Sequence, residues 1–266
     1  MTKVAEVDHA GIAAALEEAW RTRLPLEPIS SGLGVTSIDD AYAIQSRWNE
    51  IRLGEGDAVA GRKIGLTSRV VQEQMGVSEP DFGNLWESRR VPVTGGRGAV
   101  AASTFLQPRV EAELAFLMGS ELPPGEVTRE QVMRCAEAVA PALEIVDSRI
   151  VDWRITITDT IADNASYGGF ALGEWRRDWL EGDLAALDFE LRRSGGDGAR
   201  GAGAAALGHP ANAVAWLANR LRSFGVELTP GDVVLSGAVA RMLPAAAGDR
   251  FVLAVGGEDL LTLDIT

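Results

Sequence analysis

The sequence predicts an α+β fold with a helical N-terminal region. Apolar residues recur with helical spacing through roughly the first fifty residues, and from about residue 57 the pattern changes to short β-like runs separated by helices. This alternation is irregular and lacks the steady strand–helix rhythm of a doubly wound parallel sheet. We therefore expect a helical N-terminal region at 1–56 and a larger mixed domain at 57–266.

Two helices account for the N-terminal region. Asp8 is placed to cap the first helix, and Ser37 with Asp40 resembles the capping box that opens the second, which should end at Gly54. Each helix carries a stripe of large apolar side chains that should face the core. These side chains are Ile12, Leu16 and Trp20 in the first helix and Ile44, Trp48 and Ile51 in the second.

The larger domain is expected to mix strands and helices, with the Gly-rich stretch Ser194–Gly203 most simply interpreted as a mobile loop. Helices are predicted from Thr67 or Ser68 to Gly76, from Thr128 to just before Pro141, and from Pro210 to Gly225. Strands are predicted at Ala58–Ile64, Val110–Met118, Leu143–Ile150, Leu187–Arg192, Asp232–Ser236, Phe251–Val255 and Leu260–Ile265, the last two joined through Gly256-Gly257.

Charge and composition exclude several classes of protein. The chain has 25 basic and 38 acidic residues, and its net charge of −13 repels both nucleic-acid phosphates and anionic membrane surfaces. We expect neither a membrane-spanning segment nor a signal peptide, because the apolar runs are too short and the N-terminus is polar. Cys135 is the only cysteine, which fits a reducing cytoplasm. With one cysteine and two histidines the chain cannot build a thiolate or imidazole metal cage, which leaves oxygen ligands.

Almost every basic residue of the chain is an arginine. Of its 25 basic residues only Lys3 and Lys63 are lysines. Lys63 lies in AVAGRKIGLTS, an apolar stretch that contains several glycines. Its ammonium group is compact and its pKa can be shifted by the surroundings, whereas the guanidinium of an arginine is planar and does not readily release a proton. Lys63 is therefore a candidate functional residue, and a chance lysine on a strand edge is the alternative.

Three glutamates form the main candidate site. On a strand, Glu111 and Glu113 point to the same face, and that face becomes apolar toward Leu117. Glu144 lies in the apolar run VAPALEIV. Buried carboxylates repel one another and lose hydration unless a cation joins them, so this trio would suit a hard cation, Mg²⁺ or Mn²⁺. A solvated strand edge with two ordinary glutamates is the alternative, because sequence spacing cannot show that separate strands converge.

Two further polar stretches are candidates for contact with a ligand. Residues 159–169, DTIADNASYGG, run from small polar side chains into glycines, which permit close approach of the backbone to a ligand. Residues 80–83, PDFG, present Asp81. Both stretches are equally compatible with ordinary turns. Because the chain carries no Gly-x-Ser-x-Gly element and no Walker loop, a serine hydrolase or a P-loop enzyme is not expected.

Taken together, these segments resemble the 2-keto-4-pentenoate hydratase branch of the fumarylacetoacetate hydrolase superfamily. The resemblance implies a fumarylacetoacetate-hydrolase-like mixed β-sheet roll behind the helical N-terminal region. It also implies a divalent ion held by Glu111, Glu113 and Glu144, and assembly as a homo-oligomer. The matching segments follow family order and are GRKIGLTS (61–68), GVSEPDFGNL (76–85), QPRVEAELAF (107–116), PALEIVDSRI (141–150), DTIADNASYGGFALG (159–173), GHPANAVAWLANRL (208–221) and GDVVLSGA (231–238).

The residues of this branch favour hydration over the other reactions of the superfamily. Hydrolase members use a histidine-containing site that this chain does not match, and SGAV at 236–239 replaces their GTPxGVG-like element, so C–C hydrolysis is not expected. The ADNAS run looks like that of enzymes that hydrate 2-hydroxy-alka-2,4-dienoates to 4-hydroxy-2-oxo acids in the meta-cleavage catabolism of aromatic or steroid rings. Decarboxylation of 4-oxalocrotonate-type diacids at the same metal site is the alternative, and it would require an extra cation such as Arg62. A non-catalytic partner subunit is a third hypothesis.

The resemblance also suggests roles for individual residues. Lys63 would neutralise substrate charge or relay a proton, and Asp81 would act as acid or base on the water or the dienol proton. Asn164 and Ser166 would hold the carboxylate end of the substrate by hydrogen bonds. We expect a cytoplasmic enzyme acting on a small 2-oxo or 2-hydroxy-dienoate, for which an aldolase or decarboxylase of the same pathway is a candidate partner.

Overall fold

The computed structural model describes residues 7–68, 72 and 77–266. Its helices are α1 (His9–Thr22), α2 (Ile29–Gly32), α3 (Ile38–Gly54), α5 (Arg129–Cys135), α6 (Ile157–Ala162) and α7 (Pro210–Arg222). Its strands are β1 (Val59–Gly65), β2 (Asp81–Trp86), β3 (Val93–Thr94), β4 (Arg97–Val100), β5 (Arg109–Met118), β6 (Ala136–Val146), β7 (Tyr167–Leu172), β8 (Asp188–Arg193), β9 (Gly198–Ala202), β10 (Val233–Leu235), β11 (Leu243–Pro244), β12 (Arg250–Val255) and β13 (Glu258–Ile265).

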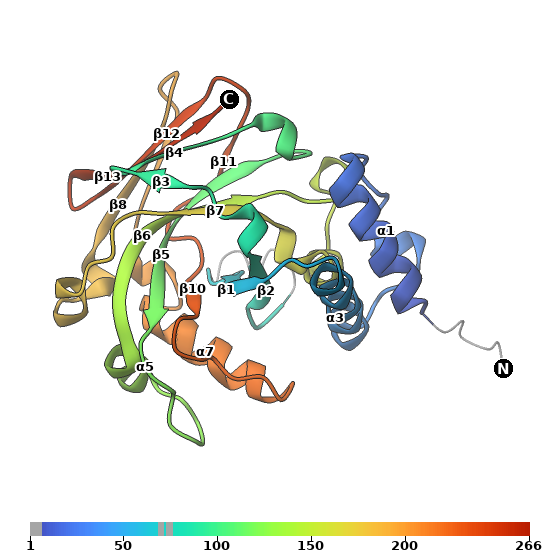
Figure 1. Cartoon of the computed structure of the whole chain (residues 1–266), viewed down its shortest axis with the longest axis horizontal. Helices are drawn as coiled ribbons and strands as arrows, with labels where there is room; N and C mark the ends of the chain where they lie inside the picture. The colour runs from blue at the N-terminus through green and yellow to red at the C-terminus, as the bar shows by residue number, and fades with distance from the viewer. Residues whose placement is uncertain (1–6, 69–71, 73–76) are drawn as a thin grey trace.

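The described strands form two sheets. The seven-stranded sheet has the order β2-β1-β10-β5-β6-β7, with β11 paired to β5, and the six-stranded sheet has the order β3-β4-β13-β12-β8-β9. The long strand β6 pairs with β5 and β7 and also contacts β12 and β13 of the other sheet. Figure 1 shows α1 and α3 together on one flank, away from the six-stranded sheet. The predicted α+β class and mixed β-sheet roll are confirmed.

The two N-terminal helices begin where their capping residues predict. The Asp8 carboxylate accepts the N–H of Gly11, and the Ser37 hydroxyl accepts the N–H of Asp40, which satisfies donors that a helix start leaves free. Their apolar stripes enter the common core, where Trp20 stacks on a tyrosine of β7 with ring centroids 6.3 Å apart. The boundary between residues 56 and 57 stays a prediction, since both sides contribute to one continuous core.

The helix predicted from Thr128 to Pro141 is much shorter than expected. It starts after Thr128, as predicted, with Thr128 and Gln131 forming a capping box, but it ends at Cys135, and β6 begins at once with Ala136. Pro141 disfavours a helix over the residues just before it. Pairing with β5 then decides the structure of this alanine-rich stretch, because tertiary context overrides a weak helix propensity. The strand predicted at Leu143–Ile150 correspondingly begins earlier and ends at Val146.

The prediction of a mobile loop at Ser194–Gly203 is wrong. The chain turns at Gly195 and Gly196, both with positive φ, and returns as β9 paired with β8. The strands β2, β3, β4, β7 and β11 were not foreseen either. For β2 and β7 the reason is that PDFG and the glycines near residue 168 were interpreted as turns or ligand-contacting loops. Of the helix predicted from Thr67 or Ser68 to Gly76, residues 69–71 and 73–76 lie outside the described ones.

Candidate active site

The pairing of β5 with β6 brings the three glutamates together. Glu111 lies directly opposite Glu144 in the antiparallel register, and Glu113 follows on the same face of β5. Each of the three offers a carboxylate oxygen, and these oxygens all lie within 4.8 Å of one another. Glu113 and Glu144 are fully buried, whereas Glu111 is partly exposed at the wall of a cavity. The solvated strand edge considered above does not describe these residues.

The protein alone does not supply enough positive charge or hydrogen-bond donors for the three carboxylates. Burial and the charge of Glu144 raise the pKa of Glu111 to about 7. Burial together with Glu144 and Glu111 raises the pKa of Glu113 well above its ordinary range. Glu113 accepts the N–H of Gly237 through Oε2 at 2.7 Å, but its Oε1 and the Oε2 of Glu144 have no hydrogen-bond partner among the described residues. Orphaned, buried carboxylate oxygens facing one another fit a divalent cation with hard oxygen ligands.

Lys63 lies on β1 and reaches the carboxylate cluster. Its Nζ is 2.8 Å from Oε1 of Glu144 and donates to the carbonyl oxygen of Ala165 at 2.7 Å. Burial lowers the pKa of Lys63, but the charges of Glu144, Glu111 and Asp81 outweigh burial and raise the pKa above its ordinary value. Lys63 is therefore a buried ammonium group. The neighbouring Arg62 donates to the carbonyl of its own preceding residue and is absent from the described cavity lining, so it is not the second cation suggested for a diacid.

Asp81 is the first residue of β2 and lies opposite Gly65 of β1. A Cβ atom on Gly65 would lie 2.1 Å from Oδ1 of Asp81, so only glycine lets the carboxylate take this position. Burial raises the pKa of Asp81 to about 6, despite the nearby charge of Lys63. The Thr160 hydroxyl lies 3.4 Å from Oδ2 of Asp81, while Oδ1 has no partner within the described chain. Asp81 is thus a carboxyl group able to take up and release a proton near neutral pH.

A left-handed turn completes this side of the site. Asn164, Ala165 and Ser166 have φ values of 53°, 51° and 52°, each of which costs about 1–2 kcal/mol for a residue other than glycine. Asn164 uses both ends of its amide on Asn84 of β2, accepting from its N–H at 2.7 Å and donating to its carbonyl at 2.9 Å. Ser166 faces the cavity beside the Thr160 hydroxyl at 3.3 Å, whereas Asn164 does not line it.

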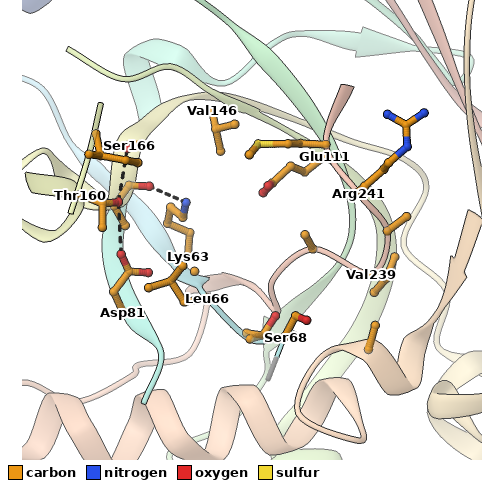
Figure 2. Close-up of a pocket in the computed structure, with 18 of the residues that line it drawn as sticks. Lys63, Leu66, Ser68, Asp81, Glu111, Val146, Thr160, Ser166, Val239 and Arg241 are labelled. Atoms are coloured by element: carbon orange, nitrogen blue, oxygen red, sulfur yellow. Dashed lines mark hydrogen bonds between the residues drawn. The ribbon is translucent and has the colours of Figure 1, made fainter. Parts of the chain in front are cut away.

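These groups surround one cavity of about 430 Å³, within the range of small-molecule sites. Figure 2 shows Lys63, Asp81 and Ser166 on one side and the Glu111 carboxylate entering from the other. Sequence reasoning missed Thr160 and Val146, although both lie inside stretches quoted above, and it had no signal for the lining segment that includes Arg241. The full described lining is Lys63, Gly65, Leu66, Thr67, Ser68, Asp81, Glu111, Val146, Trp153, Ile155, Thr160, Ala165, Ser166, Ala205, Ala238, Val239, Ala240, Arg241 and Met242.

Comparison with known families places this site in context. The C-terminal fumarylacetoacetate (FAA) hydrolase family model matches residues 66–264, and the chain therefore belongs to the fumarylacetoacetate hydrolase family. Within that family, the chain falls in the 2-keto-4-pentenoate hydratase branch, as its relatives show. It is 43% identical to a 2-hydroxyhexa-2,4-dienoate hydratase of Comamonas testosteroni, covering 94% of this chain and 95% of that one. It is 42% identical to a 2-keto-4-pentenoate hydratase of Paraburkholderia xenovorans, covering 92% and 90%.

Solved structures agree with this placement. A 4-oxalocrotonate decarboxylase from Pseudomonas putida, complexed with magnesium and adipate, superposes with a TM-score of 0.92 at 28% identity and covers 99% of both chains. The same decarboxylase complexed with calcium and acetate gives a TM-score of 0.90.

Among the described residues, no helix combines the length and the apolar character needed to cross a membrane.

Proposed function

We propose that this protein is a divalent-metal-dependent hydratase that converts 2-hydroxy-alka-2,4-dienoates into 4-hydroxy-2-oxo acids. The observation that carries the proposal is the joint presence of a carboxylate trio, a buried lysine and a protonatable aspartate at one cavity. Relatives with more than 40% identity over nearly their whole length are named as hydratases of this kind. The fit of the site and the similarity of the chain support the same activity.

Glu111, Glu113 and Glu144 would hold Mg²⁺ or Mn²⁺ in this enzyme. The donor set consists of oxygen atoms alone, and two of those atoms lack any partner in the described chain, as expected for groups that await a hard cation. When bound, such an ion supplies Lewis-acid polarisation of the substrate's 2-oxygen and carboxylate. The magnesium and calcium complexes of the structurally similar decarboxylase are consistent with a divalent ion at this site.

The remaining residues would handle substrate charge and protons. Hydration moves the enol proton from the 2-oxygen to a chain carbon, and then places the hydroxyl of water on carbon 4 and its proton on carbon 3. Asp81, with a pKa of about 6 and a free oxygen, is our candidate to carry these protons. Lys63 would offset the negative charge of the bound acid, and Ser166 would donate a hydrogen bond to its carboxylate end. Asn164 would act indirectly, by holding the turn that presents Ser166.

The 4-oxalocrotonate decarboxylase reaction is the second candidate, because a decarboxylase complexed with the diacid adipate is so similar in structure. A diacid requires a second positive group. In the described lining Arg241 is the cation other than Lys63, and its guanidinium is already paired with Asp197 at 2.7 Å and points away from the cavity centre in Figure 2. We therefore rank hydration first.

The experiment supplies both substrates to purified, magnesium-loaded protein. We expect loss of the dienoate's ultraviolet absorbance with formation of the 4-hydroxy-2-oxo acid, abolished by chelation and by Glu113→Gln. The exposed Glu137 offers a matched control, since Glu137→Gln should leave the rate unchanged. Release of CO₂ from a diacid without dienoate hydration would replace the proposal by the second candidate, and full activity in metal-free buffer would refute the metal site.

We also propose that the enzyme is a cytoplasmic homo-oligomer and that it associates with an aldolase or decarboxylase of its pathway. The single cysteine fits a reducing compartment. Light scattering of the purified protein, alone and mixed with such a partner, measures both associations. Protein that is inactive alone but required for the activity of a related subunit would instead support the non-catalytic role.

A further inference from the structure

The buried side chain of Arg149 lies outside the cavity, yet it holds both ends of the turn that positions Lys63. One guanidinium nitrogen donates to the carbonyl of Tyr167 at 2.6 Å, and another donates to the carbonyl of Asp163 at 2.7 Å. Its Nε pairs with the Asp163 carboxylate, and both side chains are fully buried. Since Asp163 and Tyr167 flank the three left-handed residues, a single planar group spans the turn from end to end.

The turn needs support of this kind. Three successive residues other than glycine with positive φ persist only where their surroundings fix them. Asn164 anchors the turn to β2 on one side, and Arg149 anchors it on the other. The carbonyl of Ala165, at the centre of the turn, is the acceptor that holds Nζ of Lys63 beside Glu144. A shift of the turn therefore moves the lysine.

The N-terminal helices close over Arg149. The centre of its guanidinium lies 5.3 Å from the ring of Trp20 in α1 and 5.3 Å from the ring of Trp48 in α3. The two indoles pack edge to face, with centroids 5.8 Å apart. Aromatic faces attract a guanidinium group and exclude water from it, which favours its contacts with Asp163 and the turn.

We propose that Arg149 is a positioning residue that transmits the packing of the N-terminal helices to the active site. Held by Asp163 and by the two tryptophans, it fixes the left-handed turn, and the turn fixes Lys63. The helical N-terminal region is then a working part of the site, although it contributes no residue to the described cavity lining. The kinetic consequence rests on the proposed hydratase function, whereas the placement of Lys63 does not.

Arg52 provides a matched control. It is also a buried arginine, 8% exposed, and belongs to α3 itself, with its guanidinium 5.0 Å from the Trp20 ring. It pairs with Glu17 and Asp57, and none of its hydrogen bonds within the described chain reaches residues 163–167. A loss of general packing should therefore affect Arg52→Lys and Arg149→Lys alike, whereas a loss of the turn's own hydrogen bonds should affect Arg149→Lys far more than Arg52→Lys, which reaches the turn only through the tryptophans.

The test follows acylation of Lys63 by an amine-reactive ester in the full-length, magnesium-loaded protein, quantified by peptide mass spectrometry. The chain has only one other lysine, Lys3, which serves as the reference within each sample. We expect Arg149→Lys to acylate Lys63 at least tenfold faster than the parent and to lose at least tenfold in kcat. We expect Arg52→Lys to raise Lys63 acylation much less than Arg149→Lys does, at a similar loss of thermal stability. Equal Lys63 reactivity in the two variants would overturn the proposal.

A second variant covers the case in which Arg149→Lys does not fold. Trp48→Leu removes one aromatic face from Arg149 but leaves its hydrogen-bond acceptors in place, and a two- to fivefold rise in Lys63 acylation is expected. Unchanged acylation in Trp48→Leu would contradict the link from helix to turn. If acylation changes as expected while the parent shows no hydratase activity, the proposed function fails and the positioning role stands.

Discussion

Neutralising one member of the carboxylate trio should change the stability of the metal-free and metal-loaded protein in opposite directions. Two full charges that lie within 4.8 Å of one another repel by at least about 3.5 kcal/mol at an effective dielectric constant of about 20. The metal-free protein must bear this repulsion or hold a proton on a carboxyl group. Glu113→Gln removes the charge and preserves an acceptor for the N–H of Gly237, so the metal-free variant should be more stable than the metal-free parent.

The metal-loaded protein should show the reverse effect. Magnesium at one hundred times its dissociation constant should stabilise the parent by about 2.7 kcal/mol, which corresponds to a rise in Tm of about 5–10 °C for a chain of this size. Glu113→Gln should lose this increment at the same concentration. Differential scanning calorimetry with chelator or with magnesium measures all four states, with Glu137→Gln as the surface control. A metal-free variant less stable than the parent, or one that keeps the full increment, would refute the reasoning.

The remaining predictions separate the roles of the neighbouring residues. Asn164→Ala should lower the free energy of unfolding, measured by urea denaturation, by about 2–4 kcal/mol, because it leaves the buried N–H and carbonyl of Asn84 without partners, and it should also lower kcat. Ser166→Ala should lower the free energy of unfolding by less than about 1 kcal/mol and chiefly raise KM. If Asp81 acts as the base, kcat/KM should fall about tenfold per pH unit below about 6 and level off above it, because only the ionised form accepts a proton; a flat profile from pH 5 to 8 would exclude this role. Gly65→Ala should displace the Asp81 carboxylate and lower kcat with little change in the far-ultraviolet circular dichroism; wild-type kinetics would contradict the 2.1 Å approach.

The carboxylate site could be predicted in part from the sequence because it depends on patterns among neighbouring residues. Glu111 and Glu113 share a face through strand periodicity alone, and an apolar environment around Glu144 demands a charged or metallic partner. The sequence could not supply the register that places Glu111 directly opposite Glu144, since nothing in either strand specifies which residues pair. Family resemblance filled that gap, and in the structure the three side chains lie together.

The left-handed turn could not be predicted in the same way. Asn164 alone carries some tendency toward positive φ, and neither Ala165 nor Ser166 shares it. The turn forms because distant groups hold it: the backbone of Asn84, and Arg149 from the far side. The family resemblance assigned Asn164 to the substrate and gave no sign that both ends of its amide are bonded to Asn84 within the protein.

The position of the site within the sheet explains why such distant support is needed. In the order β2-β1-β10-β5-β6-β7, the carboxylates come from the paired strands β5 and β6, whereas Lys63 comes from β1, two strands away from β5. Backbone pairing fixes Glu111 and Glu144 directly, since a slip of one residue would turn them to the other face. Lys63 has a long, flexible side chain, and strand register sets only where it starts. Its end must be fixed by a separate acceptor, and the turn before β7 supplies one in the carbonyl of Ala165. The rigid sheet already holds the carboxylates, but the flexible cation must be fixed beside them by other groups. This need accounts for the strained turn and for the buried arginine and tryptophans that stabilise it.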